Sequence, residues 1–163
     1  MKRPNLDELA TEKYGKDYKN KFNIDELKWG SEIPKEGIPS EMGLATYNAD
    51  DKIIRVGGQR ASGFTLFANG KNTIYFSDIL ADHGILFIEG TMGHEFVHAY
   101  HHVLFGNNFN TNFSEYSAYQ FQIDFLRSHP AYNIGIEQVI NKQATYKVDT
   151  LPYNYHYQCI PGF

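Results

Sequence analysis

"GTMGHEFVHAYHH", residues 90–102, holds four of the seven histidines of this 163-residue chain. Residues 94–98 within it read H-E-F-V-H, which is the pattern H-E-x-x-H. Because residues four apart lie on one face of a helix, about 6 Å apart along its axis, helical folding would bring His94 and His98 side by side. Glu95 lies about 100° further around the same helix. The stretch therefore predicts a helix with two histidines on one face and a carboxylate on its flank.

Two imidazoles at this spacing can bind one metal ion together. Zinc accepts histidine nitrogens at about 2.1 Å in tetrahedral sites. Glu95 points away from the histidine face, so it does not compete for the metal and can instead accept a proton from a water molecule as a general base. We expect His94 and His98 to be metal ligands and Glu95 to be the catalytic residue.

The other two histidines of the stretch do not fit the same ion. An ideal helix places His101 about 10.5 Å from His94 along the axis, too far for both to bind one zinc together with His98. His101 stays on the metal face one turn beyond His98, and His102 lies on the flank of Glu95. We expect both to be supporting or surface residues.

A catalytic zinc site needs a third protein ligand and an open position. The extended motif H-E-x-x-H-x-x-G-x-x-H does not apply, because the chain has His101 and Leu104 where that motif has glycine and histidine. A cysteine ligand before the helix is excluded as well, because the single cysteine, Cys159, lies after it. The third ligand must therefore be sought elsewhere, and a carboxylate is the natural choice.

Glu115 stands seventeen residues past His98, at the start of a second expected helix over 113–128 with Ser114 as its candidate cap. A carboxylate on a neighbouring helix would complete a site of two histidines and one glutamate. Asp124, later on the same helix, is the rival ligand. The alternative role for Glu115 is to stabilise the helix N-terminus through the helix dipole.

"HEFVH" followed by "EYSA" resembles the zincin metallopeptidases of the gluzincin type, whose pattern is H-E-x-x-H with a later E-x-x-A. The likeness covers about 75–128. It implies a zincin-like α+β fold, in which a small twisted β-sheet is followed by an active-site helix and a ligand-bearing helix. It also implies a zinc metalloendopeptidase, with Zn²⁺ as the cofactor and a peptide or protein as the substrate.

A looser resemblance covers 72–102, which is similar to metallopeptidase modules at the C-termini of bacterial polymorphic toxins. This likeness implies a toxin or effector module, exported as part of a larger bacterial protein, with a cognate immunity protein as a partner.

Zincins often stabilise the tetrahedral intermediate with a histidine or tyrosine from a separate segment. Two candidates lie near the C-terminus, His156 and Tyr157, and two lie beside the expected ligand, Tyr116 and Tyr119. The sequence leaves these four open.

The rest of the pattern predicts one α+β domain over 1–163. We expect an N-terminal surface helix over 4–22, with Asn5 as its N-cap and Leu6, Leu9 and Tyr14 facing inward. After a turn-rich connector over 28–43, alternating segments predict a meander of four strands over 43–48, 52–56, 63–68 and 72–77. The remaining expectations are the metal-site helix over 84–105, a third helix over 133–146 and an extended tail over 148–163.

Composition excludes several other classes. A net charge of −4 gives no basic footprint for nucleic acid or anionic membranes. No stretch approaches the roughly 20 apolar residues of a membrane span. The N-terminus lacks the apolar run of a signal peptide, so we expect a chain without an export signal of its own. One cysteine excludes both an intrachain disulfide and a cysteine-based zinc cluster.

The expected function is therefore hydrolysis of peptide bonds by metal-activated water. The alternatives are a zinc-binding structural or interaction module without peptidase activity, and an interaction domain whose histidines are surface residues. Glu95 favours the enzyme, because a structural zinc site does not need a non-ligand carboxylate at that position.

Overall fold

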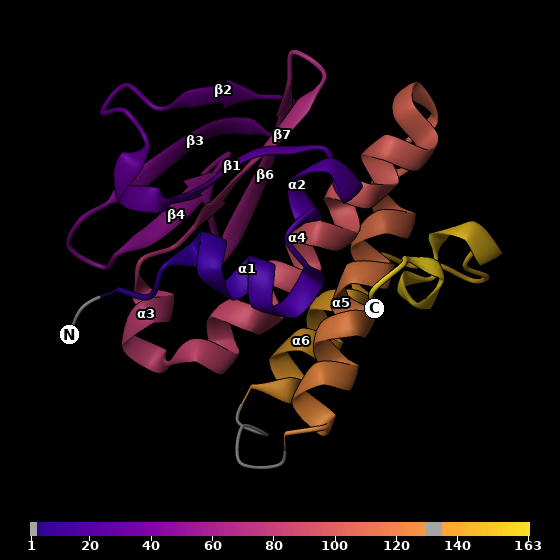
Figure 1. Ribbon diagram of the computed structural model, residues 1–163. Coiled ribbons are helices and arrows are strands. Elements are labelled where there is room, and N and C mark those ends of the chain that lie inside the picture. The colour runs from indigo at the N-terminus through magenta and orange to yellow at the C-terminus, as the bar shows by residue number, and fades with distance from the viewer. Residues whose placement is uncertain (1–2, 130–134) are drawn as a thin grey trace. The chain divides into compact units, whose positions relative to one another are not determined.

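The computed structural model describes residues 3–129 and 135–163 and has a mixed α+β structure with two small sheets and several helices (Figure 1). Its contacts divide the chain into two compact units, residues 1–92 and 93–163. The single domain over 1–163 stays a prediction.

The first unit begins with two helices that pack beside strand β1 (Figure 1). In α1 (Leu6–Tyr14), the side chain of Asn5 caps the N-terminus by accepting a hydrogen bond from the backbone N–H of Glu8 at 3.0 Å. The expected cap is confirmed, and both ends of the helix are buried. The expected helix over 4–22 is broken, however, because Gly15 ends α1 with a φ of 93°. The shorter helix α2 (Tyr18–Lys21) follows it.

The strands of the first unit form two sheets. In the three-stranded sheet the order is β1-β7-β6, and in the antiparallel four-stranded sheet it is β2-β3-β4-β5. Strand β1 runs parallel to β7, and β6 is antiparallel to β7. The strands are β1 (Ile24–Trp29), β2 (Ile38–Ser40), β3 (Gly43–Asn48), β4 (Ile53–Val56), β5 (Gln59–Ala61), β6 (Gly63–Ala68) and β7 (Lys71–Phe76).

The four expected strands exist, with ends within one residue of the prediction, but the expected single meander is wrong. The sequence analysis did not predict β1, β2 and β5. Strand β1 begins in the unassigned residues after the expected helix and runs into the connector, β2 lies within the connector, and β5 lies in an expected turn. In β1, polar residues occupy the middle of the strand and the ends, Ile24 and Trp29, are buried. Its partner β7 lies more than forty residues away, so local alternation gave no sign of the pairing.

Ser77 links the two sheets just after β7. Its Oγ accepts a hydrogen bond from the backbone N–H of Ile54 at 2.8 Å and donates to the carbonyl oxygen of Ala61 at 2.6 Å. Between the sheets, buried residues such as Phe64 and Tyr75 pack against Ile54. This apolar cluster stabilises the first unit by removing their surfaces from water.

A short helix, α3 (Ile79–His83), leads into α4 (Ile85–Phe105), which matches the helix expected over 84–105. The part of α4 from Gly93 onward belongs to the second unit. After a 3₁₀ turn, η2 (Gly106–Asn108), the second unit continues with α5 (Thr111–Arg127). The side chain of Asn110 caps α5 by accepting from the backbone N–H of Phe113 at 3.0 Å. The expected start at 113 with Ser114 as cap is therefore wrong.

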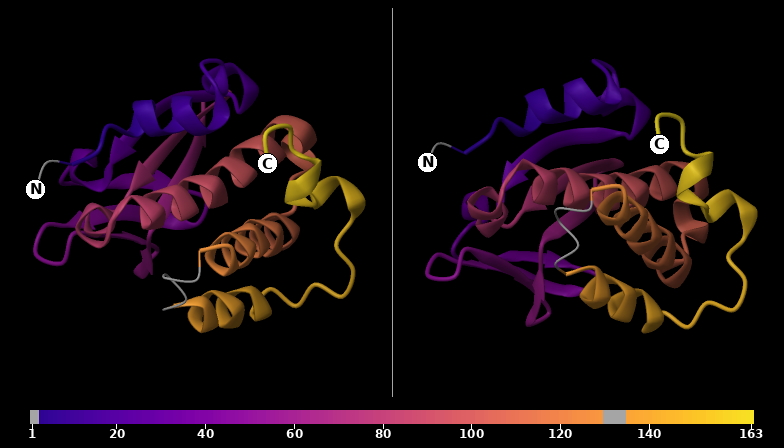
Figure 2. Two further views of the ribbon diagram at one scale, coloured as in Figure 1. Left: turned by 60° about the horizontal axis from the view of Figure 1, so that its bottom comes forward. Right: turned by 90° about the horizontal axis from the view of Figure 1, so that it is seen from below.

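Helix α6 (Ile136–Ala144) lies beside α5 (Figure 2). It falls inside the helix expected over 133–146, of which residues 133–134 lie outside the described part. The amide of Gln143 joins the two helices, because its Nε2 donates to the carbonyl oxygen of Tyr116 at 3.1 Å and to Oε1 of Gln120 at 2.9 Å.

The C-terminal segment returns to α5 and is not the extended tail that we expected. It forms two 3₁₀ turns, η4 (Tyr153–Tyr155) and η5 (Tyr157–Cys159). The ring of Tyr155 stacks on Phe105 with centroids 4.0 Å apart. The alternating aromatic residues that suggested a strand thus lie in short turns, where Tyr155 is buried and Tyr153 is exposed.

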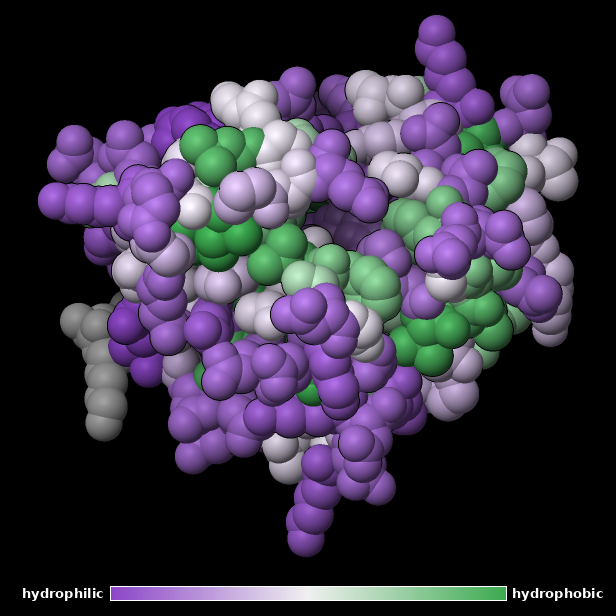
Figure 3. Space-filling view, turned by 90° about the horizontal axis from the view of Figure 1, so that it is seen from above, coloured by the Kyte–Doolittle hydropathy of each residue, from purple (hydrophilic) through white to green (hydrophobic). Residues whose placement is uncertain are grey.

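Among the described residues, no helix combines the length and the apolar character that crossing a bilayer would require. Apolar residues reach the surface in patches bordered by polar residues on the face drawn in Figure 3. Exposed apolar side chains include Met42 and Phe67 in the first unit and Val103 and Tyr153 in the second. Residues of this kind are ordinary on folded proteins, so they do not by themselves mark a binding surface.

Candidate metal centre

Helix α4 presents His94 and His98 one turn apart, within the second unit. Their ring centroids are 4.8 Å apart, and their Nε2 atoms are 3.1 Å apart. His94 is buried, and the side chain of His98 is only 12% exposed. The two imidazoles therefore point the same ring atom toward one shared position that is largely shielded from water.

Glu115 brings a carboxylate to the same position from α5. Its Oε1 lies 3.2 Å from Nε2 of His94 and forms an ion pair with Nε2 of His98. The helices can approach closely because α4 has a glycine, Gly93, against the ring of Phe121 on α5. The expected third ligand thus lies beside the two expected histidines.

Two of the three separations among these donor atoms are compatible with a single bound metal ion, and the third pair, Nε2 of His98 and Oε1 of Glu115, is in closer contact as an ion pair. In a tetrahedral site with bonds of about 2.0–2.1 Å, neighbouring donor atoms lie about 3.3 Å apart. The separations measured from Nε2 of His94, 3.1 Å and 3.2 Å, are close to that value. Two imidazoles and one carboxylate are also the donor set of known catalytic zinc sites.

Glu95 lies at the edge of this group. Its Oε2 is 3.8 Å from Nε2 of His94, and donor atoms of His94, Glu95 and His98 all lie within 4.8 Å of one another. Glu95 is thus a second candidate for the third ligand. We favour Glu115, because its oxygen lies closer to the histidine nitrogens. Glu95 then lies beside the position that the three donor atoms share.

The other ring nitrogen of each histidine is held by a polar side chain of α5. Nδ1 of His94 lies 2.6 Å from Oε1 of Gln122, and Nδ1 of His98 lies 2.7 Å from Oγ of Ser114. An amide oxygen can only accept, so Nδ1 of His94 is the donor in this contact, and a neutral ring with its proton on Nδ1 has its lone pair on Nε2. Such outer hydrogen bonds fix the tautomer and orientation of metal-binding histidines.

Tyr146, just after α6, holds the carboxylate. Its hydroxyl donates a hydrogen bond to Oε2 of Glu115 at 2.8 Å, which leaves Oε1 with the histidines. Burial and the neighbouring charge of Glu115 both raise the pKa of Tyr146 well above its usual value. The phenol therefore remains protonated and remains a donor.

Charges within the cluster shift the pKa of two members in opposite directions. Burial lowers the pKa of His98, but the carboxylate of Glu115 outweighs it and leaves this pKa raised. Burial raises the pKa of Glu115, but His98 and His94 outweigh it and leave this pKa far below its usual value. Without a metal, the cluster thus favours a protonated His98 beside an ionised Glu115.

The other two histidines of residues 90–102, His101 and His102, lie outside the group of donor atoms. His101 is fully buried, and its Nδ1 lies 2.8 Å from Oγ of Ser114. Burial lowers the pKa of His101 to about 3, so its ring is neutral at ordinary pH. His102 stacks on Phe109 with centroids 4.0 Å apart, and burial lowers its pKa to about 4.

The four candidates for stabilising an oxyanion lie in different places. Tyr119 lies beside the centre, with its ring centroid 4.5 Å from that of His94. The hydroxyl of Tyr157 donates to Asp124 at 2.5 Å, and Nε2 of His156 lies 3.2 Å from the carbonyl oxygen of Leu151. The backbone carbonyl oxygen of Tyr116 accepts a hydrogen bond from the side chain of Gln143 on α6.

The rival ligand Asp124 is engaged elsewhere on α5. It accepts hydrogen bonds from the hydroxyl of Tyr157 and, at 3.0 Å, from Nε2 of Gln120. These bonds tie the C-terminal segment to α5, which indicates a structural role for Asp124.

The sequence analysis did not predict the side chains that hold the three candidate ligands. It did not single out Gln122 or Tyr146, and it assigned Ser114 a different role. Gln122 had a detectable signal, because it lies seven residues after Glu115 and therefore on the same face of α5. Ser114 directly precedes the expected ligand, and we read it as a cap. Tyr146 had no local signal, because it reaches the centre from the segment after α6.

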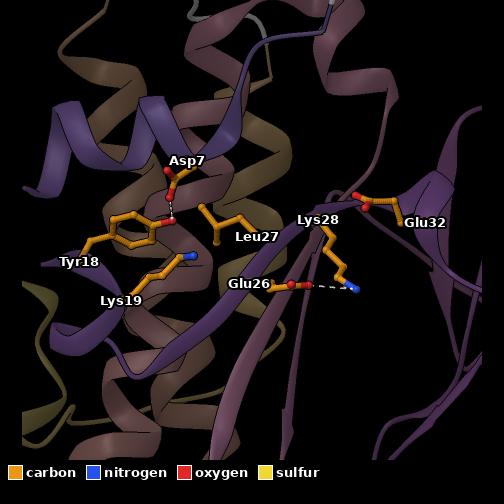
Figure 4. Close-up of a pocket in the computed structure, with 7 residues that line it drawn as sticks. All are labelled: Asp7, Tyr18, Lys19, Glu26, Leu27, Lys28 and Glu32. Carbon is orange, nitrogen blue, oxygen red and sulfur yellow. Dashed lines mark hydrogen bonds and ion pairs between the residues drawn. The ribbon is translucent and has the colours of Figure 1, made fainter. Parts of the chain in front are cut away.

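A pocket of about 270 Å³ lies in the first unit (Figure 4). Four of its five charged side chains pair with groups of the same unit. The hydroxyl of Tyr18 donates to Asp7, Nζ of Lys28 lies 3.1 Å from Glu26, and Glu32 accepts from the backbone N–H of Trp29. These pairings account for every charge that lines it except that of Lys19, which alone does not define a ligand site.

No protein-family model, curated protein or solved structure matches this chain.

Proposed function

We propose that this protein is a zinc-dependent metallopeptidase of the zincin-like α+β type, with His94, His98 and Glu115 as zinc ligands and Glu95 as the general base. One observation supports the proposal above all. Two helices bring Nε2 of both histidines and Oε1 of Glu115 to one buried position, with the carboxylate of Glu95 beside it.

A zinc ion held there would polarise a substrate carbonyl and lower the pKa of water. Glu95 would accept the proton of the attacking water and deliver it to the leaving amine. Gln122, Ser114 and Tyr146 would hold the three ligands through the bonds described above. Among the four oxyanion candidates, Tyr119 is supported best, because its ring contacts His94.

The alternative is a structural zinc site without peptidase activity. The closeness of Glu95 to the histidine nitrogens favours it, because a fourth protein ligand would close the coordination sphere and leave no position for water. The peptide or protein substrate, the export within a larger bacterial protein and the immunity-protein partner stay predictions from the resemblance.

Elemental analysis of the purified full chain tests the metal site. We expect about one zinc per chain, and we expect His94→Ala and His98→Ala to abolish tight binding. His83→Ala is the matched control, because this exposed histidine lies in the first unit. Full zinc occupancy in the variant that lacks both His94 and His98 would overturn the proposal.

A further inference from the structure

A single serine hydroxyl lies between two imidazoles in the second unit. Oγ of Ser114 is 2.7 Å from Nδ1 of His98 and 2.8 Å from Nδ1 of His101. Ser114 and His101 are both fully buried. The metal centre is therefore continued inward by a chain of three polar groups, from His98 through Ser114 to His101.

The protons along this chain are determined once His98 binds a metal through Nε2. The lone pair of Nε2 is then in use, so the proton of the neutral ring is on Nδ1 and is donated to Oγ of Ser114. The hydroxyl proton of Ser114 can then be donated to Nδ1 of His101. His101 must accept it as the neutral tautomer with its proton on Nε2.

This arrangement is costly at His101. Its Nε2 is buried and has no partner of normal hydrogen-bond geometry among the described residues, and the backbone of Tyr155 offers the ring only a poorly formed hydrogen bond. A poorly paired polar atom in the interior costs free energy that an apolar side chain of similar size would not. Aromatic rings surround the imidazole, with Tyr155 at 4.9 Å and Phe105 at 5.9 Å between centroids. Packing alone would therefore be served as well by an apolar residue.

We propose that Ser114 and His101 are positioning residues for the metal site. Nδ1 of His101 orients the hydroxyl of Ser114. This hydroxyl in turn holds His98 in the tautomer that directs the lone pair of its Nε2 at the metal. The inference rests on the proposed function, in that His98 is taken as a zinc ligand. It also explains why Ser114 directly precedes Glu115. One turn of α5 then provides both the ligand Glu115 and the hydroxyl that holds the ligand His98.

Zinc affinity of the full chain, measured by competition with a chromophoric chelator, tests the proposal. Ser114→Ala and His101→Leu should each weaken zinc binding by about 10- to 100-fold, the usual effect of removing such outer hydrogen bonds. His101→Asn should recover most of the affinity, because its Oδ1 can replace Nδ1 as the acceptor. His101→Gln places its amide near the position of Nε2 and should not. His102→Leu is the matched control.

A purely structural role for His101 predicts a different pattern. His101→Leu would then lower the melting temperature of the metal-free protein, and His101→Asn would lower it further. On our proposal His101→Leu leaves that temperature unchanged or raises it, because the poorly paired Nε2 is removed. A lower melting temperature with unchanged zinc affinity would overturn the proposal.

The wild-type protein provides a test that needs no substitution. Long-range ¹H–¹⁵N spectra of the zinc-loaded chain distinguish the tautomers of its histidines. We expect the proton on Nδ1 in His98 and on Nε2 in His101, and a proton on Nδ1 of His101 would contradict the proposal. A wrong assignment of His98 as a zinc ligand gives a different result, because His98→Ala would then bind zinc as the wild type does. If His98→Ala loses zinc while Ser114→Ala binds it normally, only the positioning inference is wrong.

Discussion

Tyr146 donates its hydroxyl proton to Oε2 of Glu115 at 2.8 Å and so holds the carboxylate by the oxygen that does not contact the histidines. The tyrosine follows α6, which is itself joined to α5 through Gln143. The carboxylate of Glu115, the third expected ligand, is therefore held both by its own helix, α5, and by the segment that follows α6.

Tyr146→Phe should weaken zinc binding by about 10- to 100-fold, because it removes one outer hydrogen bond and leaves the ring in place. Competition with a chromophoric chelator measures the affinity, and far-ultraviolet circular dichroism checks the fold. Tyr153→Phe is the control, because this side chain is 78% exposed. Equal affinity in wild type and Tyr146→Phe would show that the bond does not support the site.

Substitution of the two carboxylates of α5 should separate a ligand from a structural residue. Glu115→Ala should abolish tight zinc binding. Asp124→Ala should keep the zinc and lower the free energy of unfolding by about 1–3 kcal/mol, because Tyr157 and Gln120 lose their acceptor. Zinc content and urea unfolding of both variants decide the matter. Loss of zinc in Asp124→Ala alone would reverse the two assignments.

Gly93→Ala should destabilise the second unit. A Cβ at this position would lie 2.0 Å from Cε1 of Phe121, so the side chain or the helix would have to move. Overpacking of this kind costs about 1–3 kcal/mol, which urea unfolding can measure. Phe121→Leu should partly relieve the clash, so the double variant should be more stable than the sum of the single effects predicts. Strict additivity would mean that Gly93 and Phe121 do not constrain each other.

The sequence predicted the elements whose signal is local. The H-E-x-x-H spacing and the apolar pattern around it predicted α4, and Asn5 predicted the start of α1. The position of Glu115 after a short loop predicted that it would lie near His94 and His98, and the structure brings them together. Its role as a ligand stays a prediction, as do those of His94, His98 and Glu95.

What the sequence did not predict depends on contacts between distant segments. Strand β1 is polar in the middle and is stabilised by parallel pairing with β7, so its own pattern resembles a loop. The two sheets are joined through Ser77, which bonds to Ile54 and Ala61, and through an apolar cluster whose members come from both sheets. At the site, Tyr146 arrives from a part of the chain with no metal-binding pattern.

Zinc should stabilise the protein more at about pH 8 than at about pH 6. The pKa of His98 is raised above its ordinary 6.5, so the ion pair with Glu115 stabilises the metal-free protein fully below that value. This contribution is lost as the pH rises through the raised pKa. At low pH the carboxylate of Glu115 limits the same ion pair. Because the pKa of Glu115 is lowered, the ion pair stabilises the protein fully above the ordinary pKa of 4.5, and this stabilisation is lost as the pH falls through the lowered pKa.

Zinc competes with the proton for Nε2 of His98, so its affinity rises as that proton leaves. The measurement is the difference in melting temperature between zinc-loaded and chelator-treated protein across this range of pH. A difference that stays constant or shrinks toward high pH would contradict the assignment of His98 as a ligand.

Comparison of wild type with Glu95→Gln tests the central claim most directly, because the amide keeps the size of the side chain but cannot accept a proton. Zinc content, melting temperature and hydrolysis of casein and of a fluorescence-quenched peptide library are measured on the same two preparations. The account predicts that Glu95→Gln keeps its zinc and its fold while hydrolysis falls by at least about 100-fold, the usual contribution of a general base. Equal hydrolysis by both preparations, or loss of zinc from Glu95→Gln, would contradict it.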